Sequence, residues 1–150
     1  MPSPNRKSPV TVFAGEAIAR YGFGEGHPFG PDRHDAFLRG LEERGLKGHV
    51  QMDHPADASR EDVELFHSPH HVEFVEKMSL AGEGFLDFGD TPAFPGIFDA
   101  ARSVVGTTLR AGEMVMSGRC RRAFVPIAGL HHARRDAAAK TDGSADYPGD

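Results

Sequence analysis

Near the end of the chain the sequence reads Phe124-Val125-Pro126-Ile127-Ala128-Gly129-Leu130-His131-His132-Ala133-Arg134-Arg135-Asp136. The apolar run over residues 123–127 predicts a short strand buried on both faces, as the strands of parallel sheets are. Ligands and catalytic groups of open α/β sheets lie where such strands end. This stretch therefore predicts an α/β fold with a candidate site just after residue 127.

Two adjacent histidines, His131 and His132, follow this run. Neighbouring side chains of a strand point to opposite faces, so both imidazoles can serve one site only if the chain has already left the strand. Gly129 permits that exit. Two imidazoles facing one water or oxyanion can act as a base and as a hydrogen-bond donor. As a bare dipeptide, however, a histidine pair in a loop is more often solvated or packed.

The segment over residues 129–137 closely resembles the active-site segment of the histone deacetylase superfamily, especially its bacterial branch of acetoin-utilisation and deacetylase-like amidohydrolases. In this segment the tandem histidines are followed by alanine, two basic residues and aspartate, an order specific to the family. The resemblance implies that His131 and His132 flank a zinc-bound water that attacks an acetyl-lysine-type amide. It also implies an arginase/deacetylase-like fold, with a parallel sheet and flanking helices.

Two earlier segments resemble the same family. In Gly26-His27-Pro28 with Pro31-Asp32-Arg33, the resemblance implies that Arg33 lines an internal cavity beneath the zinc. In residues 90–98 it implies that Asp90 lies at the rim of the substrate tunnel and accepts hydrogen bonds from the substrate backbone. Without the resemblance, Arg33 is a cation in the first turn of an exposed helix, and Asp90 opens a proline-rich turn.

The resemblance covers residues 8–139 and then stops. The family continues with Gly-Phe-Cys, an Asp-x-His, a later Asp and a Tyr that polarises the substrate carbonyl, and none of these segments follows here. We therefore expect residues 1–139 to be the N-terminal part of a deacetylase-like domain, truncated, and residues 140–150 to be a disordered polar tail. Because catalytic zinc takes three protein ligands, we expect the chain alone to bind no metal and to be inactive. The alternative is a non-catalytic remnant or interaction module of the same fold.

The composition of the chain limits the classes of partner and the cellular compartment that we expect for it. The chain has 150 residues, enough for one domain, and its formal net charge of −5 gives no basic surface for nucleic acid. Its single cysteine, Cys120, favours a reducing compartment, and no long apolar run is present, so we expect a cytoplasmic protein that does not enter the membrane. By resemblance the substrate is acetylated lysine, an acetylated polyamine or another small amide. The open edge of the strand at residues 123–127 predicts self-association.

Periodicity and capping signals predict the other elements. Strands are expected at residues 10–14 and 50–52, a helix at residues 31–44 with Pro31 in its first position, and a helix from Pro69. A capping box is predicted at residues 59–62. A long helix is expected over residues 97–116, with an apolar face made by positions 97, 101, 104, 105, 108, 111 and 115. Its two interior glycines, Gly106 and Gly112, indicate close packing against a neighbour.

Three histidines, His67, His70 and His71, lie within five residues of one another. Imidazole is a ligand for zinc, copper and nickel, so the cluster suggests a metal site. The predicted helix start at Ser68 and Pro69 separates His67 from His71, however, and we expect the two rings not to meet. Structural or solvated roles are therefore the preferred interpretation.

Overall fold

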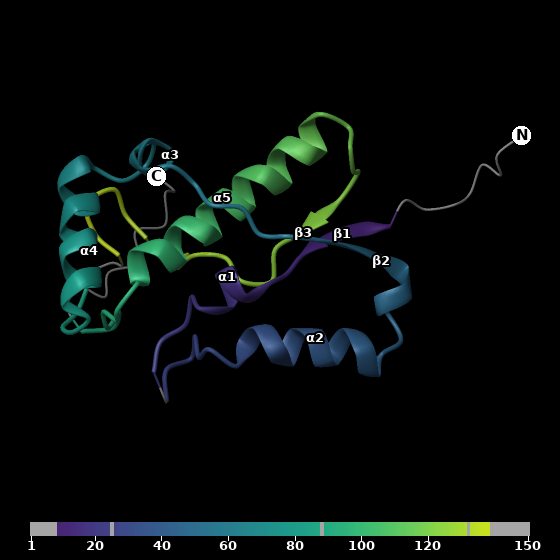
Figure 1. Cartoon of the computed structure of the whole chain (residues 1–150), viewed down its shortest axis with the longest axis horizontal. Coiled ribbons are helices and arrows are strands. Elements are labelled where there is room, and N and C mark those ends of the chain that lie inside the picture. Colours follow the sequence, from purple (N-terminus) through teal and green to yellow (C-terminus); the bar gives the residue numbers. More distant parts are fainter. Residues whose placement is uncertain (1–8, 25, 88, 132, 139–150) are drawn as a thin grey trace, which may run out of the picture.

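The strand β1 (Val10–Phe13) forms the centre of a three-stranded parallel sheet with the order β2-β1-β3. The structure, a computed structural model, describes residues 9–24, 26–87, 89–131 and 133–138 (Figure 1). β2 (Val50–Asp53) pairs along all of β1, from Val10 opposite Val50 to Phe13 opposite Asp53. β-branched and aromatic residues suit this buried position, and Val12 and Phe13 are almost fully buried. The two predicted strands at residues 10–14 and 50–52 are thus confirmed.

β3 (Ala123–Phe124) is shorter than the sequence predicts. It pairs with β1 through Ala123 opposite Thr11 and Phe124 opposite Val12, and the expected continuation to Ile127 is wrong. Pro126 explains the early end, because proline has no N–H for a ladder and restricts the residue before it. The prediction that both faces are buried is also wrong, since Phe124 is 48% exposed.

Two helices cover opposite faces of the sheet (Figure 1). α2 (Arg33–Glu43) lies on one face, where the Phe37 ring meets Phe124 of β3 at 5.4 Å between centroids. α5 (Ile97–Met116) lies on the other, where Ala111 and Met114 pack on Phe13. The short α1 (Glu16–Ala19) follows β1, and a 3-10 helix, η1 (Lys47–His49), precedes β2. The connections before and after β2 therefore lie on opposite sides of the sheet.

α2 begins two residues later than predicted. Asp32 is its N-cap, and Pro31 belongs to the turn before it, in which the Arg33 N–H donates to the Gly30 carbonyl at 3.4 Å. The prediction that Pro31 occupies the first position of the helix is therefore wrong. The helix ends next to Gly45, as the sequence predicts, and Gly45 has a φ of 63°.

α3 (Arg60–Glu64) and α4 (Pro69–Ala81) pack around the first half of α5, away from the sheet (Figure 1). The predicted capping box is confirmed, because Ser59 Oγ accepts from the Asp62 N–H at 3.1 Å and Asp62 Oδ2 accepts from the Ser59 N–H at 2.8 Å. Arg60 joins the two helices by ion pairs with Glu64 and Glu76. None of the described helices has the length and apolar character needed to cross a bilayer.

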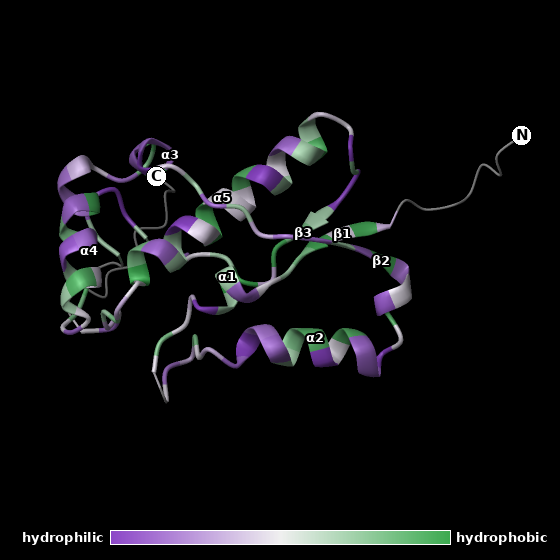
Figure 2. Ribbon diagram, in the orientation of Figure 1, coloured by the Kyte–Doolittle hydropathy of each residue, from purple (hydrophilic) through white to green (hydrophobic). Residues whose placement is uncertain are grey.

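The buried face of α5 is rotated by about one position from the predicted face. The structure buries Ile97, Ala100, Val104, Thr107, Ala111 and Met114, and Val115 is 40% exposed. Thr107 can be buried because its hydroxyl donates to the Ser103 carbonyl at 2.6 Å and accepts from the Ala56 N–H at 3.1 Å. Figure 2 shows the result, a helix of mixed polar and apolar residues over a largely apolar β1 and β3.

Gly106 is the point of closest approach in this packing. A Cβ at Gly106 would lie 2.3 Å from the Ala58 nitrogen and 2.5 Å from the Ala56 oxygen. The close packing predicted for Gly106 is therefore confirmed. At Gly112 a Cβ would meet no described atom within 4 Å, so the same prediction is wrong there.

The two glycines give a matched test of this contact. We expect Gly106→Ala to lower the free energy of unfolding by about 2 kcal/mol or more, because backbone atoms must move to admit the methyl group. Gly112→Ala should raise it by about 0.5–1 kcal/mol, because alanine is the better helix former. Urea denaturation of both variants measures the difference, and equal stabilities would contradict the packing described above.

Candidate functional site

The loops that follow β1 and β3 leave the same edge of the sheet from neighbouring strands. The connection before β2 carries α2 over one face of the sheet, and the connection after β2 carries α5 over the other face. The carboxyl ends of β1 and β3 therefore form a topological switch point. In open α/β sheets, ligands bind in the crevice at such a point. The first loop carries residues 14–32, and the second carries residues 125–138 with the predicted histidines.

Tyr21 joins these two loops. Its side chain packs against the cluster made by Ile18, Val104 and Ile127, and Val125 of the second loop packs against the same cluster. Burial raises the pKa of the Tyr21 hydroxyl to about 12, and a hydrogen bond with the backbone of Leu130 acts in the opposite direction. The phenol is therefore neutral over the whole physiological range. Tyr21 was not predicted as a site residue, although a tyrosine at the start of a glycine-rich loop after a buried strand was the available signal.

A third segment, residues 86–97, meets the first loop through His27. The His27 Nδ1 accepts from the Phe29 N–H at 3.0 Å, so Nε2 carries the proton and donates to the Asp90 carbonyl at 3.0 Å. Around this contact Phe23, Leu86, Ala93 and Ile97 form one apolar cluster, and Leu130 of the second loop packs against it. The three segments singled out from sequence therefore converge at one place.

Asp87 builds the loop that carries Asp90. Its Oδ1 accepts from the N–H groups of Gly89, Asp90 and Thr91 at 2.9–3.1 Å, and its Oδ2 accepts from the Thr91 hydroxyl at 2.5 Å. Burial would raise the pKa of Asp87, but these hydrogen bonds outweigh it and hold the pKa below its ordinary value. The Asp90 carboxylate is left exposed at the surface of the loop. Asp87 was missed, and the signal for it was an aspartate two residues before a glycine in a turn-rich segment.

Arg33 lies at the first position of α2 and is half-buried. Its guanidinium lies 4.5 Å from the centroid of the Phe29 ring. The Nη1 atom is buried and has no hydrogen-bond partner among the residues that the structure describes. Arg33 is thus not the solvated helix residue that its position alone suggests, and it presents an unused donor to an anion or a carbonyl group.

The predicted histidine pair falls partly outside the described residues. His131 is exposed and lies in irregular chain, so the backbone has left the strand before it, as the sequence predicts. Nearby, the Ala133 N–H donates to the Leu130 carbonyl at 3.2 Å, and the Ser68 N–H donates to the Arg135 carbonyl at 2.8 Å. His132 lies outside the described residues, so the convergence of the two imidazoles stays a prediction. Residues 140–150, the predicted tail, also lie outside them.

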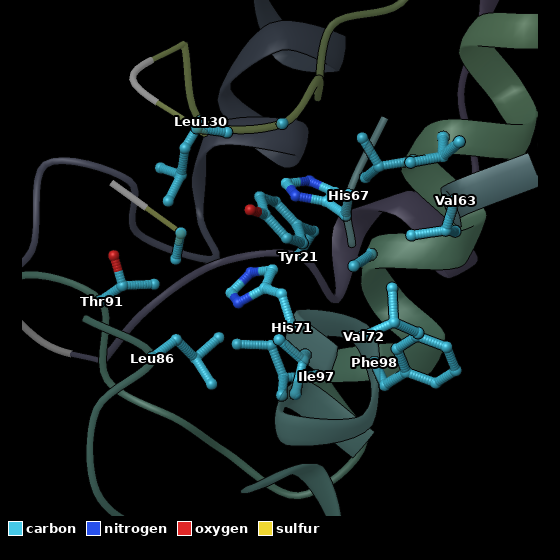
Figure 3. Close-up of a pocket in the computed structure, with 17 residues that line it drawn as sticks. Tyr21, Val63, His67, His71, Val72, Leu86, Thr91, Ile97, Phe98 and Leu130 are labelled. Atoms are coloured by element: carbon cyan, nitrogen blue, oxygen red, sulfur yellow. The ribbon is translucent and has the colours of Figure 1, made fainter. Parts of the chain in front are cut away.

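An apolar cavity of about 140 Å³ lies beneath this second loop, between α4 and α5. Figure 3 shows the rings of Tyr21, His67 and His71 in its middle. The centroids of His67 and His71 are 5.1 Å apart, so the expectation that these rings do not meet is wrong. The reason is that Ser68, as N-cap of α4, turns the chain so that His67 lies back over the first helical turn.

The described residues do not provide a zinc centre by themselves. Within the described ranges no three His, Cys, Asp or Glu side chains are close enough to hold one ion. A catalytic zinc takes three protein ligands and keeps one position open. The donor set of this part of the chain therefore does not fit the ion.

The sheet and its three converging loops define a doubly wound α/β protein with a candidate site at the switch point. A model of the histone deacetylase domain matches residues 27–140, which is more than half of the sequence. The chain belongs to the histone deacetylase family.

Individual relatives agree with this assignment. Histone deacetylase 8 of Danio rerio is 34% identical over 106 residues, which cover 66% of this chain and 28% of that protein. Histone deacetylase 6 of Arabidopsis thaliana is 28% identical over 144 residues, which cover 89% of this chain and 31% of that protein. The chain thus spans about a third or less of the length of these relatives.

A solved structure supports the fold. The crystal structure of the HDA15 HD domain matches with a TM-score of 0.73 and 20% sequence identity, over 87% of this chain and 39% of that one. The parallel sheet with flanking helices is therefore the sheet architecture of a deacetylase domain, as the sequence predicts.

Tyr21 gives a pH-dependent test of the contact between the two loops. The folded-state pKa of about 12 lies above the ordinary value of 10.0, so the stabilisation is present below pH 10 and is lost as the pH rises toward 12. We expect the free energy of unfolding to fall by about 1 kcal/mol per pH unit over this range. Urea denaturation at several pH values measures this fall. The Tyr21→Phe variant should lack the part of this fall in the free energy of unfolding that is due to ionisation of Tyr21. If the pH dependence of the variant equals that of the unchanged chain, Tyr21 does not have the raised pKa.

Proposed function

We propose that this chain is the N-terminal part of a zinc-dependent deacetylase-like amidohydrolase that hydrolyses acetyl-lysine or a similar N-acetyl amide. One observation carries the proposal. The three family-like segments, separated by up to about a hundred residues in sequence, meet at the switch point through the His27–Asp90 hydrogen bond and the packing of Leu130 on the shared apolar cluster. Substrates of α/β enzymes bind at this position.

The residues of the site have distinct proposed roles. His131 and His132 act on the attacking water as a base and as a hydrogen-bond donor. Asp90, exposed on a loop fixed by Asp87, accepts N–H groups of the substrate backbone, which is a charge-assisted and geometrically specific contact. Arg33, with its buried unused donor, lines an internal cavity that admits the released acetate.

The relatives support a proposed substrate class. The matched proteins of zebrafish and Arabidopsis are named histone deacetylases, which supports acetylated lysine as the substrate. An acetylated polyamine or another small amide has the same reacting bond. We further propose that the chain belongs to the bacterial acetoin-utilisation branch, on the order of residues 129–137. The zinc ligands are proposed to lie outside these 150 residues.

A chimera tests the proposed function. Residues 1–139 replace the corresponding part of Danio rerio histone deacetylase 8, and hydrolysis of an acetyl-lysine peptide is measured. We expect activity that His131→Ala or His132→Ala lowers by about 100-fold or more in kcat, because each removes a proton-transfer group. His49→Ala, at an exposed histidine of η1, is the matched control and should leave kcat unchanged. A folded chimera whose His131 and His132 variants keep full kcat would overturn the assigned roles.

The 150-residue chain alone should show no turnover that a chelator abolishes, because the segments that carry the Asp-x-His and the later Asp in the family do not follow residue 139 in it. Robust chelator-sensitive hydrolysis by the pure chain would contradict this expectation.

We also propose that the chain associates with itself through the edge of β3. Within the described residues β3 pairs on one side only, with β1, and Phe124 beside that edge is 48% exposed. An unpaired edge is a template for another strand, and charge on it opposes pairing. Light scattering with size exclusion should show a concentration-dependent dimer that Phe124→Lys weakens. Phe66→Lys, at a 55% exposed phenylalanine after α3, is the matched control, and a stronger effect there would place the interface elsewhere.

A further inference from the structure

His71 lies in the wall between two spaces of the structure. It lines the apolar cavity of about 140 Å³ between α4 and α5, where Figure 3 shows its ring. It also lines a second pocket of about 260 Å³, the Asp136 pocket, which lies between α4, the loop built by Asp87 and residues 136–137. Only 6% of His71 is exposed. A rotation of this one side chain can therefore exchange an apolar environment for a polar one.

The cavity side disfavours a charged His71 ring. The ring centroid lies 5.1 Å from that of His67, and the buried Nδ1 of His67 makes no hydrogen bond with any residue that the structure describes. His71 is also in the first turn of α4, where the helix dipole is unfavourable to a cation. Burial lowers the pKa of His71, and the nearby His67 lowers it further. The ring in the cavity is therefore uncharged at neutral pH.

The Asp136 pocket offers an acceptor to a charged ring. Asp136 is exposed, and its carboxylate raises the pKa of His71, whereas burial, His67 and His70 all lower it. Asp87 lines the same pocket, but its oxygens already accept hydrogen bonds from the loop that it builds. An engineered cavity of about 150 Å³ holds benzene, so the Asp136 pocket has room for an imidazole ring.

The other groups around His71 do not change charge on mild acidification unless they are histidines. Among the described residues that line the two spaces, the other titratable side chains are Tyr21 and His67 on the cavity side, and His70, Asp87 and Asp136 on the pocket side. Tyr21 keeps its proton to about pH 12, and hydrogen bonds hold the pKa of Asp87 below its ordinary value. Histidine is the side chain that titrates between about pH 5 and 8, and His71 is the histidine that lines both spaces.

The second loop is attached to the start of α4. The N–H of Ser68, the N-cap of α4, donates to the Arg135 carbonyl at 2.8 Å, directly before Asp136. Leu130 and Ala133 of the same loop line the apolar cavity. A ring that leaves the cavity for the Asp136 pocket therefore changes the surroundings of this loop at both places.

We propose that His71 is a pH-sensitive switch: its neutral ring packs beside His67 in the apolar cavity, and its protonated ring turns to the Asp136 carboxylate and moves the second loop. Because the pKa of His71 in the cavity lies below its ordinary value of 6.5, the movement takes place as the pH falls below 6.5. The second loop carries His131, so acidification alters the candidate site. This consequence for hydrolysis rests on the proposed function, whereas the movement of the ring does not.

Nuclear magnetic resonance on the whole 150-residue chain tests the movement without any measurement of hydrolysis. The ring protons of His71 are followed from about pH 8 to about pH 4.5, the range in which histidine titrates. At the upper end we expect a nuclear Overhauser contact between this ring and the methyl groups of Ile97, which line the same cavity. As the ring gains its proton, with a midpoint below pH 6.5, this contact should be lost and a contact with the Ala137 methyl group should appear.

The backbone amide signals of Leu130 and Ala133 should shift with the same midpoint. A ring that stays unprotonated at about pH 4.5, a contact with Ile97 that persists after protonation, or amide signals that do not follow the midpoint would each overturn the proposal. Failure here leaves the chimera test of the proposed function unaffected.

Two matched substitutions locate the acceptor. Asp136→Asn removes the carboxylate at an exposed position, so the midpoint of His71 should move to lower pH and the contact with Ala137 should be lost. Asp99→Asn makes the same change at an exposed aspartate of α5 that lines neither space, and it should leave the midpoint and the contact as they are. Circular dichroism checks that both variants are folded. A midpoint in Asp136→Asn equal to that of the unchanged chain would overturn the proposal, and if a variant does not fold, the titration of the unchanged chain still decides it.

Discussion

The contact between α5 and residues 56–58 is the constraint on which the rest of the structure depends. Gly106 lets the two backbones touch, and the side chains of Arg102 and Ser103 add hydrogen bonds to Ala58 and Asp57 at 2.7 Å and 2.5 Å. This contact fixes the direction in which α5 crosses the sheet after β2. The chain then returns beside β1 as β3, which completes the strand order β2-β1-β3 and the switch point.

Local signals in the sequence were sufficient for most elements. The capping box at Ser59, the helix start at Ser68 and the helix stop at Gly45 each depend on a few neighbouring residues, and each is confirmed. The errors arose where tertiary contacts decide. The buried face of α5 depends on the hydrogen bond that Thr107 accepts from Ala56, far away in the sequence. The length of β3 was a different kind of error, because Pro126 is a local signal that ends the strand early within an apolar run.

In the candidate site, too, some features were predictable from short sequence segments and others depend on contacts between distant residues. The family-like order of residues predicts site roles for Arg33, Asp90 and His131, and the structure brings their three segments together. Sequence alone did not reveal the residues that hold these segments in place. Tyr21 and Asp87 act by burial and by hydrogen bonds to backbone groups, and such supporting contacts depend on chain folding that no short motif encodes. The meeting of His67 and His71 was likewise hidden, because it depends on the angle at which the chain enters α4.

The position of β1 at the centre of the sheet has a consequence for how the protein is made. Thr11, near the N-terminus, pairs with Ala123, and Phe13 is covered by Ala111 and Met114. β1 precedes α5 and β3 in the chain, so it lacks its helix cover and its second neighbouring strand until residues 111–124 are present. Contacts between such distant residues form slowly, and an uncovered apolar strand is prone to wrong pairing meanwhile. The burial of β1 is therefore completed only when α5 and β3 are in place.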